Sequence, residues 1–156
     1  METEGLKAFF RSQLEETLVG YLKDFDALTH EQLDVSPGGK ARTAYDFSYE
    51  IAVLNVRFAK RMQGIDPGDW PFEGWVVAPT DHRSKDRMRE AIANSNDSLL
   101  KAWDELPAAE MFRPIATKTG ETNPLQLASF ASIHTSYHDA QLNYLQALHG
   151  DDQMHQ

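Results

Sequence analysis

The stretch from Asn123 to Gly150, NPLQLASFASIHTSYHDAQLNYLQALHG, decides the fold because both of its ends carry clear helix signals. Asn123 suits the N-cap, Pro124 suits the first helical position, and Gly150 suits the position just after a helix. These signals predict a helix of about 26 residues, or roughly 39 Å. One face of the helix is expected to be buried, because four of its apolar residues recur on the same side: Leu127, Phe130, Leu145 and Leu148.

Three further segments have the same helical periodicity, and connections rich in polar residues, proline or glycine separate them. The first runs from about Thr3 to Leu28. The second begins at Thr43, which forms a predicted capping box with Asp46, and Gly64 is placed to end it. The third covers about Thr80 to Leu106.

Four long amphipathic helices in one chain predict an all-α fold, namely a four-helix bundle. The bundle is expected to form one domain over residues 1–150, with a short polar tail at 151–156. The connection from Gly64 to Pro79 is long enough for a crossover between the second and third helices, which would then run parallel. The segment from Pro107 to Glu121 has the alternation of a short hairpin. Three aromatic residues are expected to pack the long connection onto the body: Trp70, Phe72 and Trp75.

Composition and charge exclude several classes of function. The chain has 156 residues, no cysteine and a net charge of −9. Without cysteine there is no thiolate metal site, no cysteine nucleophile and no redox switch, and this absence agrees with a cytoplasmic protein. An acidic chain without a basic stripe is not expected to bind nucleic acid or an anionic membrane. No apolar run approaches the length of a membrane span.

Two histidines on the last helix are the strongest candidates for chemistry. His134 and His138 are four residues apart, so they lie on one side of the helix, at the centre of its expected apolar face. This spacing is what a metal ion needs to take two ligands from a single helix. The alternative is a pair of core histidines that hydrogen bond to tyrosine, serine or backbone groups.

A third ligand is expected from a neighbouring helix, and Glu50 is the best candidate. It lies at the border of the buried face expected for the second helix. The residues three and four positions away include no cation, so no local ion pair explains this glutamate. Asp46 is a rival, but its capping role already accounts for it.

Two other polar residues near the histidines are candidates for catalytic roles. Gln141 follows His138 by about one helical turn on the same side, where it could orient a bound nucleophile. Tyr137 is a candidate hydrogen-bond donor close to the site, and Tyr144 is an alternative for the same role.

The run from Ile133 to Leu142, IHTSYHDAQL, and the following LHGD at 148–151 resemble the last-helix motif of the DinB-like family. The start of the second helix, with Arg42-Thr43 and then residues 46–55, is similar to that family as well. The resemblance implies a four-helix bundle that holds a divalent metal through one side chain of the second helix and two of the last. It also implies a bacterial protein that forms a homodimer.

Carried over by position, the resemblance assigns Glu50, His134 and His138 as the metal ligands. The family usually has histidine at the position of Glu50. Two histidines and one carboxylate nevertheless form a known open-faced site that suits Fe(II), with Zn, Ni and Mn as alternatives.

Two functional hypotheses follow. In the first, the protein is a metalloenzyme whose open metal site activates water or a small-molecule thiol, which corresponds to hydrolase or thiol S-transferase chemistry on a small-molecule substrate. Because the chain has no cysteine, the thiol must be a low-molecular-weight cofactor of the glutathione, bacillithiol or mycothiol type. In the second, the protein is a non-catalytic bundle or binding protein with an empty site, in which Glu50 pairs with a protonated His138.

Overall fold

The computed structural model describes residues 2–155, and most of these residues are helical. This confirms the expectation of a mainly helical protein. Four helices are long: α1 (Glu2–Ala27), α3 (Ala44–Met62), α4 (Lys85–Glu105) and α5 (Pro124–Leu148). The connections contain a short helix and two 3-10 turns: α2 (His30–Asp34), η1 (Thr80–His82) and η2 (Ala108–Glu110). They also contain the antiparallel pair of strands β1 (Ile115–Thr117) and β2 (Gly120–Thr122).

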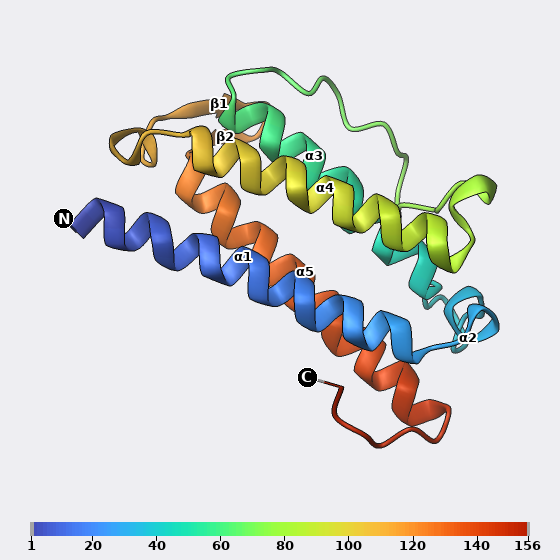
Figure 1. The fold of residues 1–156 in the computed structure, drawn as a ribbon. Helices are drawn as coiled ribbons and strands as arrows, with labels where there is room; N and C mark the ends of the chain where they lie inside the picture. The colour runs from blue at the N-terminus through green and yellow to red at the C-terminus, as the bar shows by residue number, and fades with distance from the viewer. Residues whose placement is uncertain (1, 156) are drawn as a thin grey trace.

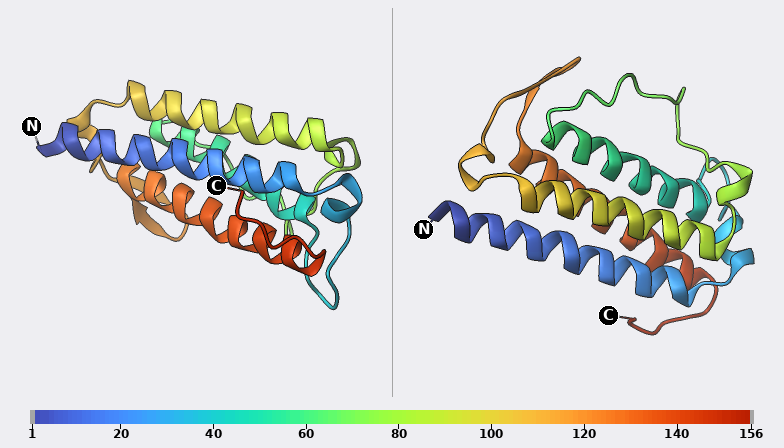
Figure 2. Two further views of the ribbon diagram at one scale, coloured as in Figure 1. Left: turned by 60° about the horizontal axis from the view of Figure 1, so that its bottom comes forward. Right: turned by 45° about the horizontal axis from the view of Figure 1, so that its top comes forward.

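The four long helices lie side by side with roughly aligned axes (Figures 1 and 2). α3 packs against α4 and α5, and α1 packs against α5 and α4. The chain direction in Figure 1 shows that α1 and α5 run one way while α3 and α4 both run the other way. Residues 63–84 therefore return along the outside of the molecule from the end of α3 to the start of α4.

The helix ends that frame the candidate site form as expected. The Thr43 side chain accepts a hydrogen bond from the backbone N–H of Asp46, and the Asp46 carboxylate accepts one from the backbone N–H of Thr43. Asn123 caps α5 by accepting from the backbone N–H of Gln126. Gly150 follows the C-cap of α5 with a φ of 85°, a conformation that favours glycine.

Two other helix boundaries differ from expectation. The helix expected from about residue 80 begins at Lys85, because Thr80–His82 forms a 3-10 turn and Ser84 supplies the cap. α2 was not expected at all. It begins with a complete capping box between Thr29 and Gln32, which is the same local signal that marks the start of α3.

Two aliphatic residues, and not the tryptophan beside them, anchor the long connection to the body. Trp75 is 70% exposed, so the expectation that it packs onto the body is wrong. Val76 and Ala78 are instead almost completely buried, at 1% and 3% exposure. Phe72 is partly buried. The Trp75 ring lies over the guanidinium of Arg42, at 4.7 Å from the ring centre.

Two clusters of buried apolar side chains fill the space between the long helices. One is rich in aromatic residues of α1 and α3, including Tyr21, Phe25 and Tyr45. The other surrounds Trp103 of α4, whose indole N–H donates to the backbone carbonyl of Lys7 at 3.0 Å. Within the described part of the chain, no helix is both long enough and apolar enough to cross a membrane.

Candidate metal centre

One of the two histidines of α5 lies on the buried face of the helix, and the other lies at the edge of that face. This face is centred near Thr135 and Leu142, roughly 80° around the helix from His134. His138 is only 1% exposed, whereas His134 is partly buried. The expectation that both histidines lie at the centre of the buried face is therefore right for His138 only. Phe130, which was assigned to the apolar stripe, is 50% exposed.

The three expected ligands come together at the seam between α3 and α5. Glu50 is supplied by α3, and His134 and His138 by α5. Nε2 of His138 lies 3.6 Å from Oε2 of Glu50 and 3.1 Å from Nε2 of His134. Each of the three residues offers one ligand atom, and these atoms all lie within 4.8 Å of one another.

The ring of His138 is held on two sides. The ring of Phe47 stacks on it with centres 5.1 Å apart and planes 2° apart. Nδ1 of His138 donates to Oε1 of Gln141 at 2.7 Å. The proton is thus on Nδ1, and the lone pair on Nε2 faces Glu50 and His134. Histidines that ligate metals almost always donate their other ring N–H to an oxygen acceptor in this way.

Gln141 and Tyr137 both contact His138, although not in the way that the spacing suggested. Gln141 engages the ring nitrogen that does not face Glu50, so its contact orients the imidazole rather than a nucleophile between the ligands. Tyr137 is 60% exposed, and its ring meets the His138 ring edge-on at 5.1 Å. Their catalytic roles stay predictions.

Glu50 has a partner that the sequence analysis missed. The guanidinium of Arg42 donates to Oε2 of Glu50, and the two side chains are only 15% and 16% exposed. Arg42 is not a neighbour of Glu50 on the helix: it precedes the N-cap of α3 and its side chain reaches Glu50 in the second turn. A basic residue directly before the capping box is the signal that could have identified this pair.

The charges around the site favour the forms of the side chains that bind metal. Burial disfavours ionisation of Glu50, but the neighbouring His138 and the hydrogen bond from Arg42 outweigh this effect and lower the pKa of Glu50 to about 2. Burial lowers the pKa of His134 to about 4, and the neighbouring His138 acts in the same direction. At neutral pH, Glu50 is therefore a carboxylate and His134 is a neutral imidazole. Metal ions bind these forms.

The donor set fits a divalent transition metal. Two imidazole nitrogens and one carboxylate oxygen suit Zn, Fe, Ni or Mn, and three protein ligands leave positions open for a substrate or water. A scan against protein-family models and a search of curated proteins found no match to this chain.

Proposed function

We propose that this protein is a divalent-metal-dependent enzyme of the DinB-like type. In this proposal the fold is a four-helix bundle in which residues 63–84 form the crossover between α3 and α4. The shared direction of these two helices supports that topology (Figure 1). The H-x-x-x-H-x-x-Q pattern supports the family assignment, because His134, His138 and Gln141 form one continuous chain of contacts along α5.

One observation carries the metal site. Ligand atoms of Glu50, His134 and His138 converge within 4.8 Å of one another. The contact between His138 and Gln141 strengthens this argument, because it leaves the Nε2 lone pair of His138 directed toward the other two ligands. A pair of core histidines without a metal would need only one satisfied hydrogen bond each and would not require a carboxylate from another helix.

The residues of the chain have separate tasks in this enzyme. When bound, the cation supplies Lewis-acid activation of a water molecule or a small-molecule thiol, which is the basis of hydrolase or thiol S-transferase chemistry. Glu50 provides the negative charge that balances the cation. Phe47 and Gln141 fix the His138 ring. Because the chain contains no cysteine, a thiol must be a separate small molecule.

Metal content and metal-dependent stability test the proposal. Protein purified without a histidine tag should contain about one equivalent of metal, and added Zn(II), Ni(II) or Mn(II) should raise the melting temperature of metal-stripped protein. A metal at 100 times its Kd stabilises the native state by about 2.7 kcal/mol. His134→Ala and His138→Ala should each abolish this shift. His149→Ala is the matched control, because His149 is an exposed histidine at the end of the same helix. Absence of bound metal and of any shift in the wild type at neutral pH would refute the site.

A non-catalytic bundle is the second candidate, and the ion pair between Arg42 and Glu50 favours it. When His138 carries a proton on both ring nitrogens, its Nε2 at 3.6 Å from the same carboxylate completes a charge network that needs no cation. This candidate predicts that His138→Ala lowers the melting temperature while divalent metals leave the melting temperature of the wild type unchanged. Thermal denaturation with and without metal therefore separates the two candidates.

A further inference from the structure

A cleft lies beside the candidate metal centre, along the seam between α3 and α5. On α3, Leu54 and Arg61 follow Glu50 at helical spacing and share its side of the helix. On α5, Phe130 precedes His134 by about one turn. Leu54, Arg61 and Phe130 line one cleft with a volume of about 1140 Å³. The hairpin β1–β2, which lies beside the C-terminal end of α3, lines the cleft as well (Figures 1 and 2).

The part of the cleft nearest the ligands is apolar. The rings of Phe58 and Phe130 meet edge-on with centres 5.7 Å apart, and both line the cleft. Phe130 also contacts the metal centre. Its ring stacks on the ring of His134 with centres 5.7 Å apart and planes 15° apart. Leu54 and Leu127 extend the apolar surface. A ligand in the cleft would therefore place apolar groups directly beside a metal ligand.

The far part of the cleft is lined by charged side chains of both signs. Four cationic side chains line it: Arg57, Arg61, Arg113 and Lys118. Arg57 donates to the backbone carbonyls of residues 67–69, Arg113 pairs with Glu110, and Lys118 pairs with Asp69. Among residues 2–155, the Arg61 side chain has no hydrogen-bond or ion-pair partner.

The acidic side chains that line the cleft do not neutralise Arg61. Asp66 accepts from the backbone N–H of Gly68, and Asp69 is paired with Lys118. Glu121 is exposed on β2 and forms no ion pair within the described part of the chain. A partly buried, unpaired guanidinium at the end of an apolar cleft is suited to a ligand that brings its own negative charge.

We propose that this cleft binds an elongated substrate with an apolar body and an anionic head group, either carboxylate or phosphate. The head group pairs with Arg61, the body lies against Leu54, Phe58 and Phe130, and the reacting end reaches the metal ligands. The assignment of the reacting end rests on the proposed function. Arg61 follows Glu50 by 11 positions, which is roughly 16 Å along the helix axis. The Arg61 side chain covers part of this distance, so a substrate of about ten carbon atoms or more can reach from the guanidinium to the metal ligands.

Calorimetric titration of the protein with decanoate, decyl phosphate and the neutral decanamide tests this proposal. Each titration is run with a chelator present and again with Zn(II), because a carboxylate can also bind a metal directly. At least one of the two anions should bind in the presence of chelator, and decanamide should bind more weakly. Arg61→Gln should lower the affinity for the anion about tenfold, as expected for a charge-assisted hydrogen bond worth about 1.5 kcal/mol, and should leave decanamide binding unchanged. Which anion binds more tightly identifies the head group.

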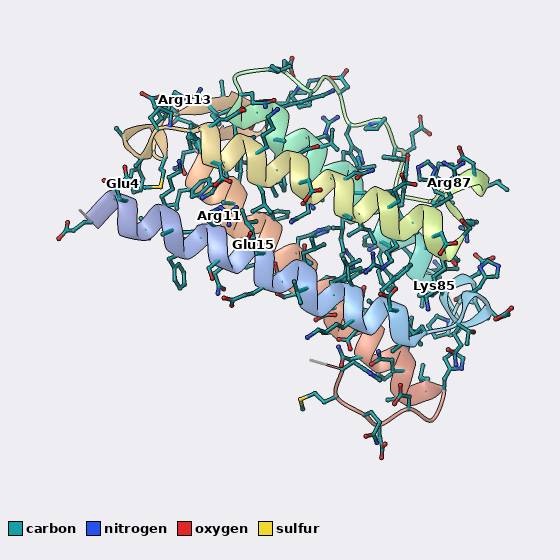
Figure 3. All side chains as sticks on the ribbon, in the orientation of Figure 1. Glu4, Arg11, Glu15, Lys85, Arg87 and Arg113 are labelled. Atoms are coloured by element: carbon teal, nitrogen blue, oxygen red, sulfur yellow. The ribbon has the colours of Figure 1, made fainter. Side chains whose placement is uncertain are left out.

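Two further variants complete the test. Arg87→Gln is the control, because Arg87 is exposed at the opposite end of the molecule from Arg113 of the cleft (Figure 3). Phe130→Ala should weaken binding of both the anions and decanamide. Equal affinity of wild type and Arg61→Gln for the anions, or no binding of either anion, would overturn the proposal. His134→Ala should retain anion binding while it loses metal, so failure of the metal site and failure of the cleft are distinguishable.

Discussion

Arg42 and the proposed metal ion compete for one carboxylate oxygen. Oε2 of Glu50 accepts from the Arg42 guanidinium and also faces Nε2 of His138. A cation that uses this oxygen must share it with Arg42 or displace the guanidinium. The Trp75 ring, 4.7 Å from the guanidinium, gives Arg42 a second contact besides Glu50. Arg42 thus opposes metal binding while it stabilises the empty site.

We expect Arg42→Gln to raise the affinity for Zn(II) by about three- to tenfold, because the variant removes a competing charged hydrogen bond from Glu50. The same substitution should lower the melting temperature of metal-free protein. Competition with a chromophoric chelator measures the affinity. Arg89→Gln is a suitable control, because it breaks a comparable pair with Asp26 on the exposed surface. Unchanged affinity in Arg42→Gln would show that Glu50 is not a ligand.

Replacement of Glu50 tests the third ligand directly. Glu50→Gln removes the charge and keeps the size of the side chain, so we expect the affinity for metal to fall by at least about tenfold, as for the loss of a charged ligand. Glu50→His should retain metal binding, because it restores the ligand that the DinB-like family usually has at this position. Chelator competition and elemental analysis give the result. Loss of metal from both variants to the same extent would argue that the carboxylate is specifically required.

The parts of the site that were predictable are those fixed by helix geometry. His134 and His138 are four residues apart on one helix, so their proximity follows from the spacing alone. The contact between His138 and Gln141 is local in the same sense. Arg42 was not predictable from periodicity, because it lies outside the helix of its partner Glu50 and the path of the chain before the N-cap sets the contact.

At the scale of the helix, α5 shows why residue type alone misplaces a buried face. The large apolar residues Phe130 and Leu148 suggested a face centred on His134, yet both are at least half exposed. The residues that face the neighbouring helices include Ala128, Ala131 and Ser132, whose small side chains allow close approach. A periodicity analysis that weights large apolar residues overlooks such positions.

The helix starts that were predicted are those with a single candidate cap. Thr43 and Asn123 each stand alone before a helical pattern, and both cap their helices. The helix expected from about Thr80 starts later, and Ser84 is its cap. The packing of η1 explains the later start, because the ring of His82 lies against Tyr49 at 4.9 Å and keeps residues 80–82 out of the helix.

The contact between α1 and α5 contains two carboxyl groups with one clear consequence for stability. Asp24 is 2% exposed and accepts from the side-chain amides of Asn143 and Gln146. Asp139 lies beside it, with Oδ1 buried and without a hydrogen-bond partner among the described residues. Burial and the neighbouring Asp24 raise the pKa of Asp139 to about 7. Lys23 lines the same surface depression as Asp139.

We expect the contribution of Asp139 to stability to fall as the pH rises from about 4 to about 7, because the folded state holds the Asp139 proton more tightly than an unfolded Asp with a pKa near 3.9. Below about pH 4 the carboxyl is protonated in the folded and the unfolded state, so it no longer makes the stability depend on pH. Asp139→Asn should therefore flatten the pH dependence and stabilise the protein at pH 8 more than at pH 5. Melting temperatures measured with a chelator present test this, and Asp97→Asn on the exposed face of α4 is the control. An equal effect of Asp139→Asn at both pH values would contradict the assignment.

For the whole molecule, the number of long helices was predictable, because each helix carries its own periodicity and end signals. That α3 and α4 run in the same direction was predictable only from the length of the connection between them. Residues 63–84 are long enough to connect two parallel helices. How that connection attaches was not predictable, because Val76 and Ala78 are small and their burial depends on a groove formed by other elements.

The outer side of α5 carries an apolar stripe that is suited to self-association. Four large side chains recur at helical spacing and are each more than half exposed: Ile133, Tyr137, Tyr144 and Leu148. Contiguous exposed apolar surface of this kind is typical of a protein interface. We therefore expect a homodimer in which two copies of the chain share this stripe.

Light scattering coupled to size-exclusion chromatography should therefore give about twice the monomer mass of 17.7 kDa. In a two-fold symmetric interface, one substitution introduces a charge on both sides of the contact, so its effect is doubled. We expect Ile133→Glu with Tyr144→Glu to give a monomer that keeps its helical circular dichroism spectrum and binds metal, because neither side chain belongs to the buried core. Val19→Glu is the control, because Val19 is 51% exposed on α1 and should leave the dimer intact. A monomer mass for the wild type at high concentration would exclude the dimer. A dimer that persists in the double variant would instead place the interface on another surface.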